Sequence, residues 1–465
     1  MSRQRPDGTE EVTKRRFRMK FIHHFVGILL LLLCSSVGCA RSLARIDVAR
    51  DAFAVGDLTI AEETLVDLSQ SKDRFSSAAA LDLAMVELAT GDAKSAEQRF
   101  RKLRDEFDSL PKVAPVHEAA AMVSDDTARI YRPSAYEQIM IRAMLAVCSL
   151  ATDGADAESY ALQAAMRQSE LAEEAKGRGI ENVSAIYQSI AFAPYLRGVL
   201  REATHHDYDD AARAYQLVSA VEPRFSAVSN DIARANLGSH SNPGHGVLYV
   251  IGCVGRGPVL KEVEAPTTTA AMQIASAVLN VTTNQKDGGK DRALALANIA
   301  SVKVPQVVTP PSEVIGLGVR ADGVAIGVTE TLTSVSELAT KQTEAEMPWT
   351  IARAVMRRAA KETTVATVGN QLGLSGAAGS LFHFAAASAW SGSERVDTRC
   401  WGLLPREIQV LRAELPAGHY TISLSSIGRS GHPIGGGVER PVTIIDGRNE
   451  YLIAIAPDAT IYLAR

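Results

Sequence analysis

The chain has 465 residues and a net charge of −4, with 46% hydrophobic, 22% charged and 5% aromatic residues. This composition excludes a disordered or fibrous protein, and the length is sufficient for about three domains. The first 38 residues carry seven basic and three acidic side chains, which leaves −8 for residues 39–465. A negatively charged body without a long run of Lys and Arg argues against nucleic acid as a partner.

The first forty residues predict an exported protein. A basic segment ends at Lys20, an apolar core covers residues 25–33, and small residues lead to Gly38 and Cys39. This is the three-part form of a bacterial export signal, and its apolar core is shorter than the ~20 residues that a transmembrane helix needs. Residues 1–38 are therefore predicted to be a lipoprotein signal peptide.

Cys39 is the predicted lipid attachment site. The residues before it, Ser36-Val37-Gly38, resemble the lipobox at which the bacterial lipoprotein signal peptidase cuts. The thiol would take a diacylglycerol and the freed amine a further chain such as palmitate, which together give stable membrane anchorage. Because Ala40 follows in place of Asp, we expect the outer membrane, facing the periplasm. Secretion without a lipid is the alternative.

Residues 39–237 are predicted to form a helical repeat domain. Apolar residues recur at intervals of three and four, and Gly-Asp turns at residues 56 and 91 begin similar patterns 35 residues apart. The spacing is typical of the second helix of a tetratricopeptide repeat, in which a small residue lets two helices approach closely. A generic helical bundle is the alternative. A third copy of the pattern follows Asp207. The patterned residues of the three copies are Ala61, Leu65 and Leu68; Ala96, Phe100 and Leu103; and Ala211, Tyr215 and Val218.

Residues 238–246 contain Pro and Gly, interrupt the helical pattern, and are predicted to be a linker. Residues 247–465 are predicted to form a mixed α/β domain, so the fold class is α+β multidomain. Short apolar or alternating runs between Gly, Pro and Asp predict strands, and those in 406–465 suggest a small antiparallel β-sandwich. The strands are expected at 247–251, 261–264, 314–319, 324–328, 408–413, 419–424, 442–445 and 451–456.

A helical insertion is predicted at residues 349–390. From Trp349 to Glu362, apolar residues share one helix face and basic residues the other, which predicts either a core-facing helix or a helix lying on anionic lipid. The stretch from Val365 to Trp390 is nearly uncharged and rich in Gly and Ala. We expect this stretch to pack inside the domain, with insertion into a membrane as the alternative.

Asp397, Arg399 and Trp401 are the candidate binding or structural motif. In a strand these alternate residues would point to the same face, where Arg can pair with Asp and stack on the indole. A rigid structural arrangement is the favoured interpretation, and a contact surface for a peptide or glycan is the alternative.

No catalytic group, metal site or cofactor is predicted. Cys148, Cys253 and Cys400 are widely spaced and no C-x-x-C occurs, so buried free thiols are expected, with at most one disulfide. The paired histidines lack partners at metal-ligand spacing, and no nucleophile motif with its supporting partners is present. We therefore expect a protein that is not an enzyme.

Four short motifs carry a resemblance to a known group of proteins. The motifs are Tyr131-x-Pro133-Ser134-Ala135-Tyr136-Glu137, Pro194-Tyr195-Leu196-x-Gly198, Gly257-Pro258-x-x-Lys261-Glu262 and Asp397-Thr398-Arg399-x-Trp401-x-x-Leu404-Pro405-x-Glu407-Ile408. Together they resemble uncharacterised bacterial lipoproteins with an N-terminal tetratricopeptide-like region. Because that family has no settled activity, the resemblance implies export, lipidation and architecture, but no mechanism.

The sequence thus predicts an envelope lipoprotein that acts as a protein-binding or assembly scaffold. Stacked helical repeats form a concave groove in which an unknown envelope protein would be held. A membrane-active or pore-associated component that uses residues 349–390 is the alternative, and an unrecognised enzyme is the third hypothesis.

We expect Cys39→Ala to abolish labelling by a clickable fatty acid and to leave the precursor uncut, because Cys39 is the acceptor at the predicted cleavage site. Gel analysis of labelled cells measures both effects. Cys34→Ala, inside the leader, is the control and should be labelled like the wild type. Undiminished labelling of Cys39→Ala would contradict the predicted anchor.

Overall fold

The computed structural model describes residues 42–110, 131–180, 182–187, 190–282, 300–371 and 396–464. The predicted signal peptide, Cys39 and residues 372–390 of the predicted insertion lie outside these ranges. Within them, helices come first and sheets follow, so the protein is mixed α/β with a helical N-terminal half.

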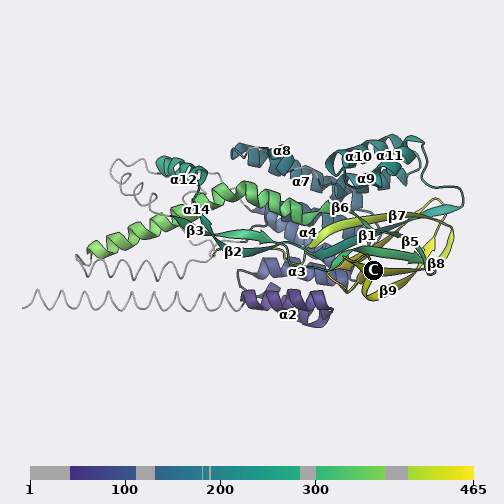
Figure 1. The fold of residues 1–465 in the computed structure, drawn as a ribbon, viewed down its shortest axis with the longest axis horizontal. Helices are drawn as coiled ribbons and strands as arrows, with labels where there is room; N and C mark the ends of the chain where they lie inside the picture. The colour runs from purple at the N-terminus through teal and green to yellow at the C-terminus, as the bar shows by residue number, and fades with distance from the viewer. Residues whose placement is uncertain are drawn as a thin grey trace, which may run out of the picture.

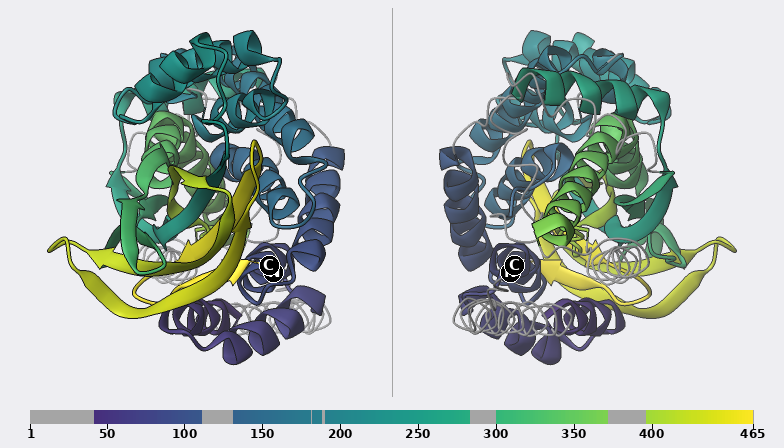
Figure 2. Two further views of the ribbon diagram at one scale, coloured as in Figure 1. Left: turned by 90° about the vertical axis from the view of Figure 1, so that its right-hand side faces the viewer. Right: turned by 90° about the vertical axis from the view of Figure 1, so that its left-hand side faces the viewer.

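The helical half is a row of helices in which consecutive members pack against one another. Figure 2 shows that the row curves as an arc around the sheets. The row opens with a helix over residues 42–55. It continues with α2 (Leu58–Gln70), α3 (Ser76–Ala89), α4 (Ala93–Ser109), α6 (Ala135–Leu150), α7 (Ala157–Gly177), α8 (Val183–Ile186), α9 (Phe192–Glu202), α10 (Tyr208–Val221) and α11 (Val228–Asn236).

The two Gly-Asp turns begin their helices in the same way. Asp57 and Asp92 are the N-caps of α2 and α4, and each carboxylate accepts a backbone N–H three residues later, at 3.1 and 3.0 Å. Gly56 and Gly91 have φ values of +102° and +91°, which glycine adopts without strain. The apolar positions predicted behind all three turns are buried: Ala61, Leu65, Leu68, Ala96, Phe100, Leu103, Ala211, Tyr215 and Val218.

The second half contains two facing sheets and a two-stranded ribbon. The five-stranded sheet has the order β11-β10-β1-β7-β6, the four-stranded sheet has the order β5-β4-β8-β9, and β2 pairs with β3. Strands β1 and β10 are parallel, and the other pairs are antiparallel. The strands are β1 (His245–Arg256), β2 (Val259–Pro266), β3 (Ser301–Val308), β4 (Val314–Ala321), β5 (Val324–Val328), β6 (Glu330–Ser334), β7 (Pro405–Pro416), β8 (Gly418–Gly428), β9 (Pro433–Ile444), β10 (Asn449–Ala456) and β11 (Tyr462–Ala464).

Strand β1 lies at the centre of a three-layer body. Its side chains at Tyr249 and Ile251 belong to the core shared with the helices, whereas Leu248 and Val250 pack in the core between the two sheets. The five-stranded sheet is therefore covered by helices on one face and by the second sheet on the other. A strand buried on both faces has an uninterrupted apolar sequence, which is the pattern that predicted β1.

The structure differs from the prediction at two boundaries, that of the β-sandwich and that of the linker. The sandwich is larger than residues 406–465, because β10 returns beside β1 and β8 pairs with β4. Strand β1 begins at His245, inside the predicted linker 238–246. That connection is held on the sheets, since Asn242 donates two hydrogen bonds to Glu414, from its backbone (2.7 Å) and its side-chain amide (2.8 Å).

A long helix and a short one form an arm that projects from the body (Figure 1). They are α12 (Thr269–Thr282) and α14 (Val335–Gln371), which pack with the β2–β3 ribbon. The amphipathic helix predicted from Trp349 is part of α14, and its apolar residues Ile351 and Val355 are buried against α12 and β3. Among the described residues, no helix has the length and hydropathy needed to cross a membrane.

We expect Gly198→Ala to lower the free energy of unfolding by about 1–3 kcal/mol, because the new methyl group overpacks the contact between α9 and α10. A Cβ at Gly198 would lie 2.5 Å from the Tyr215 ring, which is fully buried. Gly177→Ala at the end of α7 is the control, since nothing lies within 4 Å of its Cβ position. Urea titrations followed by circular dichroism compare the variants, and equal stability would contradict the close helix packing.

Candidate functional site

Residues 396–405 run between the helices and the five-stranded sheet and connect the two halves. Trp401 is fully buried and packs on Phe100 of α4, with ring centroids 5.2 Å apart. The segment has no helix or strand until β7 begins at Pro405. Its buried peptide groups therefore need hydrogen-bond partners from elsewhere.

Two buried carboxylates of the helices accept the backbone N–H groups of this segment. Glu137 of α6 accepts the N–H of Trp401 at 2.6 Å, and Asp82 of α3 accepts the N–H of Leu403 at 2.8 Å. The helices thus bind residues 396–405 much as a receptor binds an extended peptide, through its main chain.

Arg50 and Asp82 form a buried ion pair at this interface. Arg50 Nε lies 2.7 Å from Asp82 Oδ2, and the two side chains are 9% and 0% exposed. The guanidinium also donates to the carbonyl of Cys400 at 2.6 Å. Burial raises the pKa of the Asp82 carboxyl, while the charge of Arg50 and the N–H groups of the segment oppose that rise. Both groups are thereby engaged in holding the segment.

Glu137 is held by the start of its own helix. The backbone N–H and the hydroxyl of Ser134 donate to its Oε2 at 2.6 and 2.8 Å, and the Tyr131 hydroxyl donates at 3.1 Å. Burial raises the pKa of Glu137, and the donors, Trp401 first among them, oppose the rise. This capping box presents the second carboxylate oxygen to the segment.

The predicted motif of Asp397, Arg399 and Trp401 lies in the same segment. Arg399 donates to both carboxylate oxygens of Asp397, at 2.8 and 2.6 Å, which confirms the predicted pair. These residues form no strand, so their alternation does not place them on one face of a sheet. The predicted stacking of Arg399 on the indole is wrong: Arg399 lies over the Tyr131 ring instead, 5.7 Å from its centroid, and Trp401 packs on Phe100. Both side chains are buried, which supports the structural interpretation.

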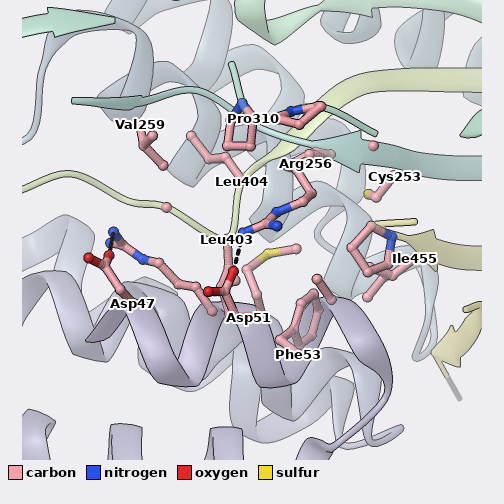
Figure 3. A pocket seen from close by; sticks show the side chains of 18 of the residues that line it. Asp47, Asp51, Phe53, Cys253, Arg256, Val259, Pro310, Leu403, Leu404 and Ile455 are labelled. Atoms are coloured by element: carbon pink, nitrogen blue, oxygen red, sulfur yellow. Dashed lines mark hydrogen bonds and ion pairs between the residues drawn. The ribbon is translucent and has the colours of Figure 1, made fainter. Parts of the chain in front are cut away.

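A cavity of about 370 Å³ opens beside residues 402–405 (Figure 3). This interface cavity lies between the helix over 42–55, the end of β1 and the loop at 310–311. Its volume is near the lower end of the range for small-molecule sites, about 300–1,000 Å³. Its buried apolar lining includes Phe53, Ala54, Met85, Leu403, Leu404 and Ile455, and the charged residues at its mouth are Asp47, Asp51, Arg256 and Lys261.

Opposite charges meet across the mouth of the interface cavity. Asp51 and Arg256 form an ion pair of 2.6 Å, with side chains that are 68% and 29% exposed (Figure 3). Burial raises the pKa of Asp47, and the positive charges of Arg50, Lys261 and Arg256 oppose the rise. The mouth therefore carries both acids and bases close to one another.

The three cysteines of the body are buried free thiols, as predicted. Cys253 lines the interface cavity, and burial raises the pKa of its thiol to about 12. The thiolate that nucleophilic chemistry requires is therefore scarce at neutral pH. No cluster of residues within the described ranges has an arrangement that would hold a metal ion.

No known protein family, curated protein or solved structure matches the chain. The site is therefore described from its own geometry.

Sequence reasoning did not single out Arg50, Asp82, Asp47 or Asp51. A signal for Asp82 was present, because it is the single charged residue in the apolar run 78–86 of a helix. A charge at such a position implies a buried partner.

We expect Asp82→Ala to lower the free energy of unfolding by about 3–5 kcal/mol, because Arg50 and the Leu403 N–H would stay buried without their partner. The control is Asp67→Ala, which removes an exposed ion pair with Arg45 and should cost less than about 1 kcal/mol. Urea unfolding measures both variants. A small loss for Asp82→Ala would show that the buried pair does not hold the segment.

Proposed function

We propose that the protein is a lipid-anchored binding component of a bacterial envelope, a scaffold and not an enzyme. Cys39 would hold it in the outer membrane, facing the periplasm. The observation that carries the proposal is the interface cavity, which has an apolar interior and a charged mouth. One wall is the helix over residues 42–55, which lies close to Cys39 in the sequence.

Binding suits the chemistry of this cavity better than catalysis. A catalytic acid or base needs a pKa near the working pH. The Cys253 thiol has a pKa of about 12, and Arg50 is engaged with a buried carboxylate. At the mouth, Asp51 is paired with Arg256, and Asp47 lies 3.8 Å from the Arg50 guanidinium. Such a site is suited to holding a small ligand in a defined orientation.

We retain the tetratricopeptide-like interpretation of the helices as part of the proposal. The matching turns at Asp57 and Asp92 support it. The face of the arc that points toward the sheets is occupied by residues 396–405 and by the five-stranded sheet. We therefore place the ligand in the interface cavity, and an envelope protein partner would contact the opposite face of the arc.

The membrane-active alternative has less support. It depends on residues 349–390, and the apolar face of that helix, including Ile351 and Val355, packs against α12 and β3 within the protein. This face is therefore already used in the arm.

We expect a screen by thermal shift to find a small compound that raises the melting temperature of the wild type but not of Ala54→Leu. Ala54 lines the interface cavity and is 6% exposed, so a leucine there would fill part of the space. Amino acids, short peptides, sugars and phosphorylated metabolites are screened. Ala44→Leu, on the exposed side of the same helix, is the control and should respond like the wild type. The proposal fails if no compound acts in a manner that depends on Ala54.

A further inference from the structure

We propose that the interface cavity binds a small zwitterion with an apolar side chain, such as a free apolar amino acid or its dipeptide. The inference rests on the proposed function and adds the chemical class of the ligand. It is carried by the opposite charges at the mouth and the apolar residues beneath them (Figure 3).

The two signs of charge come from opposite walls of the cavity. Asp47 and Asp51 stand four residues apart on the helix over 42–55, so their carboxylates share one helix face. Arg256 ends β1 and Lys261 lies in β2. A ligand with an ammonium group toward the helix and a carboxylate toward the strands would meet complementary charge on both sides.

The ion pair between Asp51 and Arg256 is the one that such a ligand would replace. Insertion of a zwitterion exchanges this single pair for two, ammonium with Asp51 and carboxylate with Arg256. Because both side chains are partly exposed, the existing pair contributes little and is readily exchanged. Arg50 is not available for this purpose, since it is committed to Asp82 and to the Cys400 carbonyl.

Other classes of ligand fit the mouth less well. A polyphosphate would be repelled by Asp47 and Asp51, and a polyamine by Arg256 and Lys261. A neutral apolar molecule would remove these charges from water without adding a hydrogen bond to them, which is unfavourable. The cavity volume of about 370 Å³ also limits the ligand to a small molecule.

The interior of the cavity selects for an apolar side chain. Phe53, Met85 and Ile455 line it and are at most 2% exposed. A ligand side chain placed against these residues would remove its own apolar surface from water. Leucine should therefore bind more tightly than serine, which carries the same two charges on a polar side chain.

Isothermal titration calorimetry on the lipidated protein in detergent micelles tests the charge requirement. The probes are L-leucine, L-leucyl-L-leucine, N-acetyl-L-leucine, L-leucine amide and L-serine. We expect leucine or its dipeptide to bind, and the acetylated and amidated analogues, each lacking one charge, to bind about tenfold more weakly or worse. Equal affinity of leucine and both analogues would overturn the inference, as would the failure of both zwitterions to bind.

Two variants assign the two charges of the ligand. Arg256→Gln should weaken leucine about tenfold while leaving the already weak leucine amide unchanged, because the amide has no carboxylate to lose. Asp51→Asn should weaken leucine and leave N-acetyl-leucine unchanged. Arg45→Gln, in an exposed pair on the same helix outside the cavity, is the control and should bind leucine like the wild type. Unchanged leucine affinity in both test variants would place the ligand elsewhere and overturn the inference.

The two proposals fail separately. If the screen finds an Ala54-dependent ligand of another class, such as a sugar, the binding function of the cavity stands and the zwitterion is wrong. If no compound depends on Ala54, the proposed function falls and the inference falls with it.

Discussion

The backbone of residues 396–405 is buried but forms no helix and no sheet before Pro405. Charged side chains of the helices form hydrogen bonds with its peptide groups instead. Asp82 accepts the N–H of Leu403, and Glu137 accepts the N–H of Trp401. Each of these N–H groups would lower the free energy of unfolding by about 1–3 kcal/mol if it were buried without an acceptor. The acceptors belong to the first half of the chain and the donors to the second. Each half is therefore incomplete alone, and the apolar core that runs from the helices into the five-stranded sheet extends this dependence.

Three of the four short motifs noted in the sequence meet at this segment, and the last of them covers most of it. Glu137 belongs to the first motif and Trp401 to the last, and the two are directly hydrogen-bonded. Gly257 of the third lies against Leu404, where a Cβ would be 2.1 Å from the carbonyl oxygen, and Glu262 accepts the backbone N–H at the start of the segment. These motifs are thus parts of one structural arrangement. None of these motifs carries catalytic chemistry of its own. Their residues are explained by their contacts with the same buried segment, residues 396–405.

Elements with a local signal were predictable and those defined by distant partners were not. The continuous apolar run of β1 and the Gly-Asp turns of α2 and α4 identify themselves within a few residues. Strand β6, with the sequence ETLTS, is short and polar because it pairs only with β7 at the sheet edge, and it was missed. The parallel pairing of β1 with β10 joins residues about two hundred apart, beyond any local pattern. The alternation of Asp397, Arg399 and Trp401 suggested a strand, but distant side chains support that backbone instead. The charged residues at the mouth of the cavity come from separate parts of the chain, so the sequence does not show that they meet. Taken alone, Asp47 and Asp51 predict only a solvent-exposed helix face.

The helix over residues 42–55 connects the buried segment to the cavity. Arg50 points inward to Asp82 and the Cys400 carbonyl, while Asp51, its neighbour in sequence, reaches across the mouth to Arg256. One turn of helix therefore takes part in both the internal contact and the mouth. Since the internal contact is buried and well satisfied, it fixes the position of this helix, and the exposed pair at the mouth is left as the part that a ligand can exchange. The same helix is the first described element, and the internal contact and the proposed ligand site share it. A protein built in this way would keep its body unchanged on binding and alter only the charges at the mouth of the cavity.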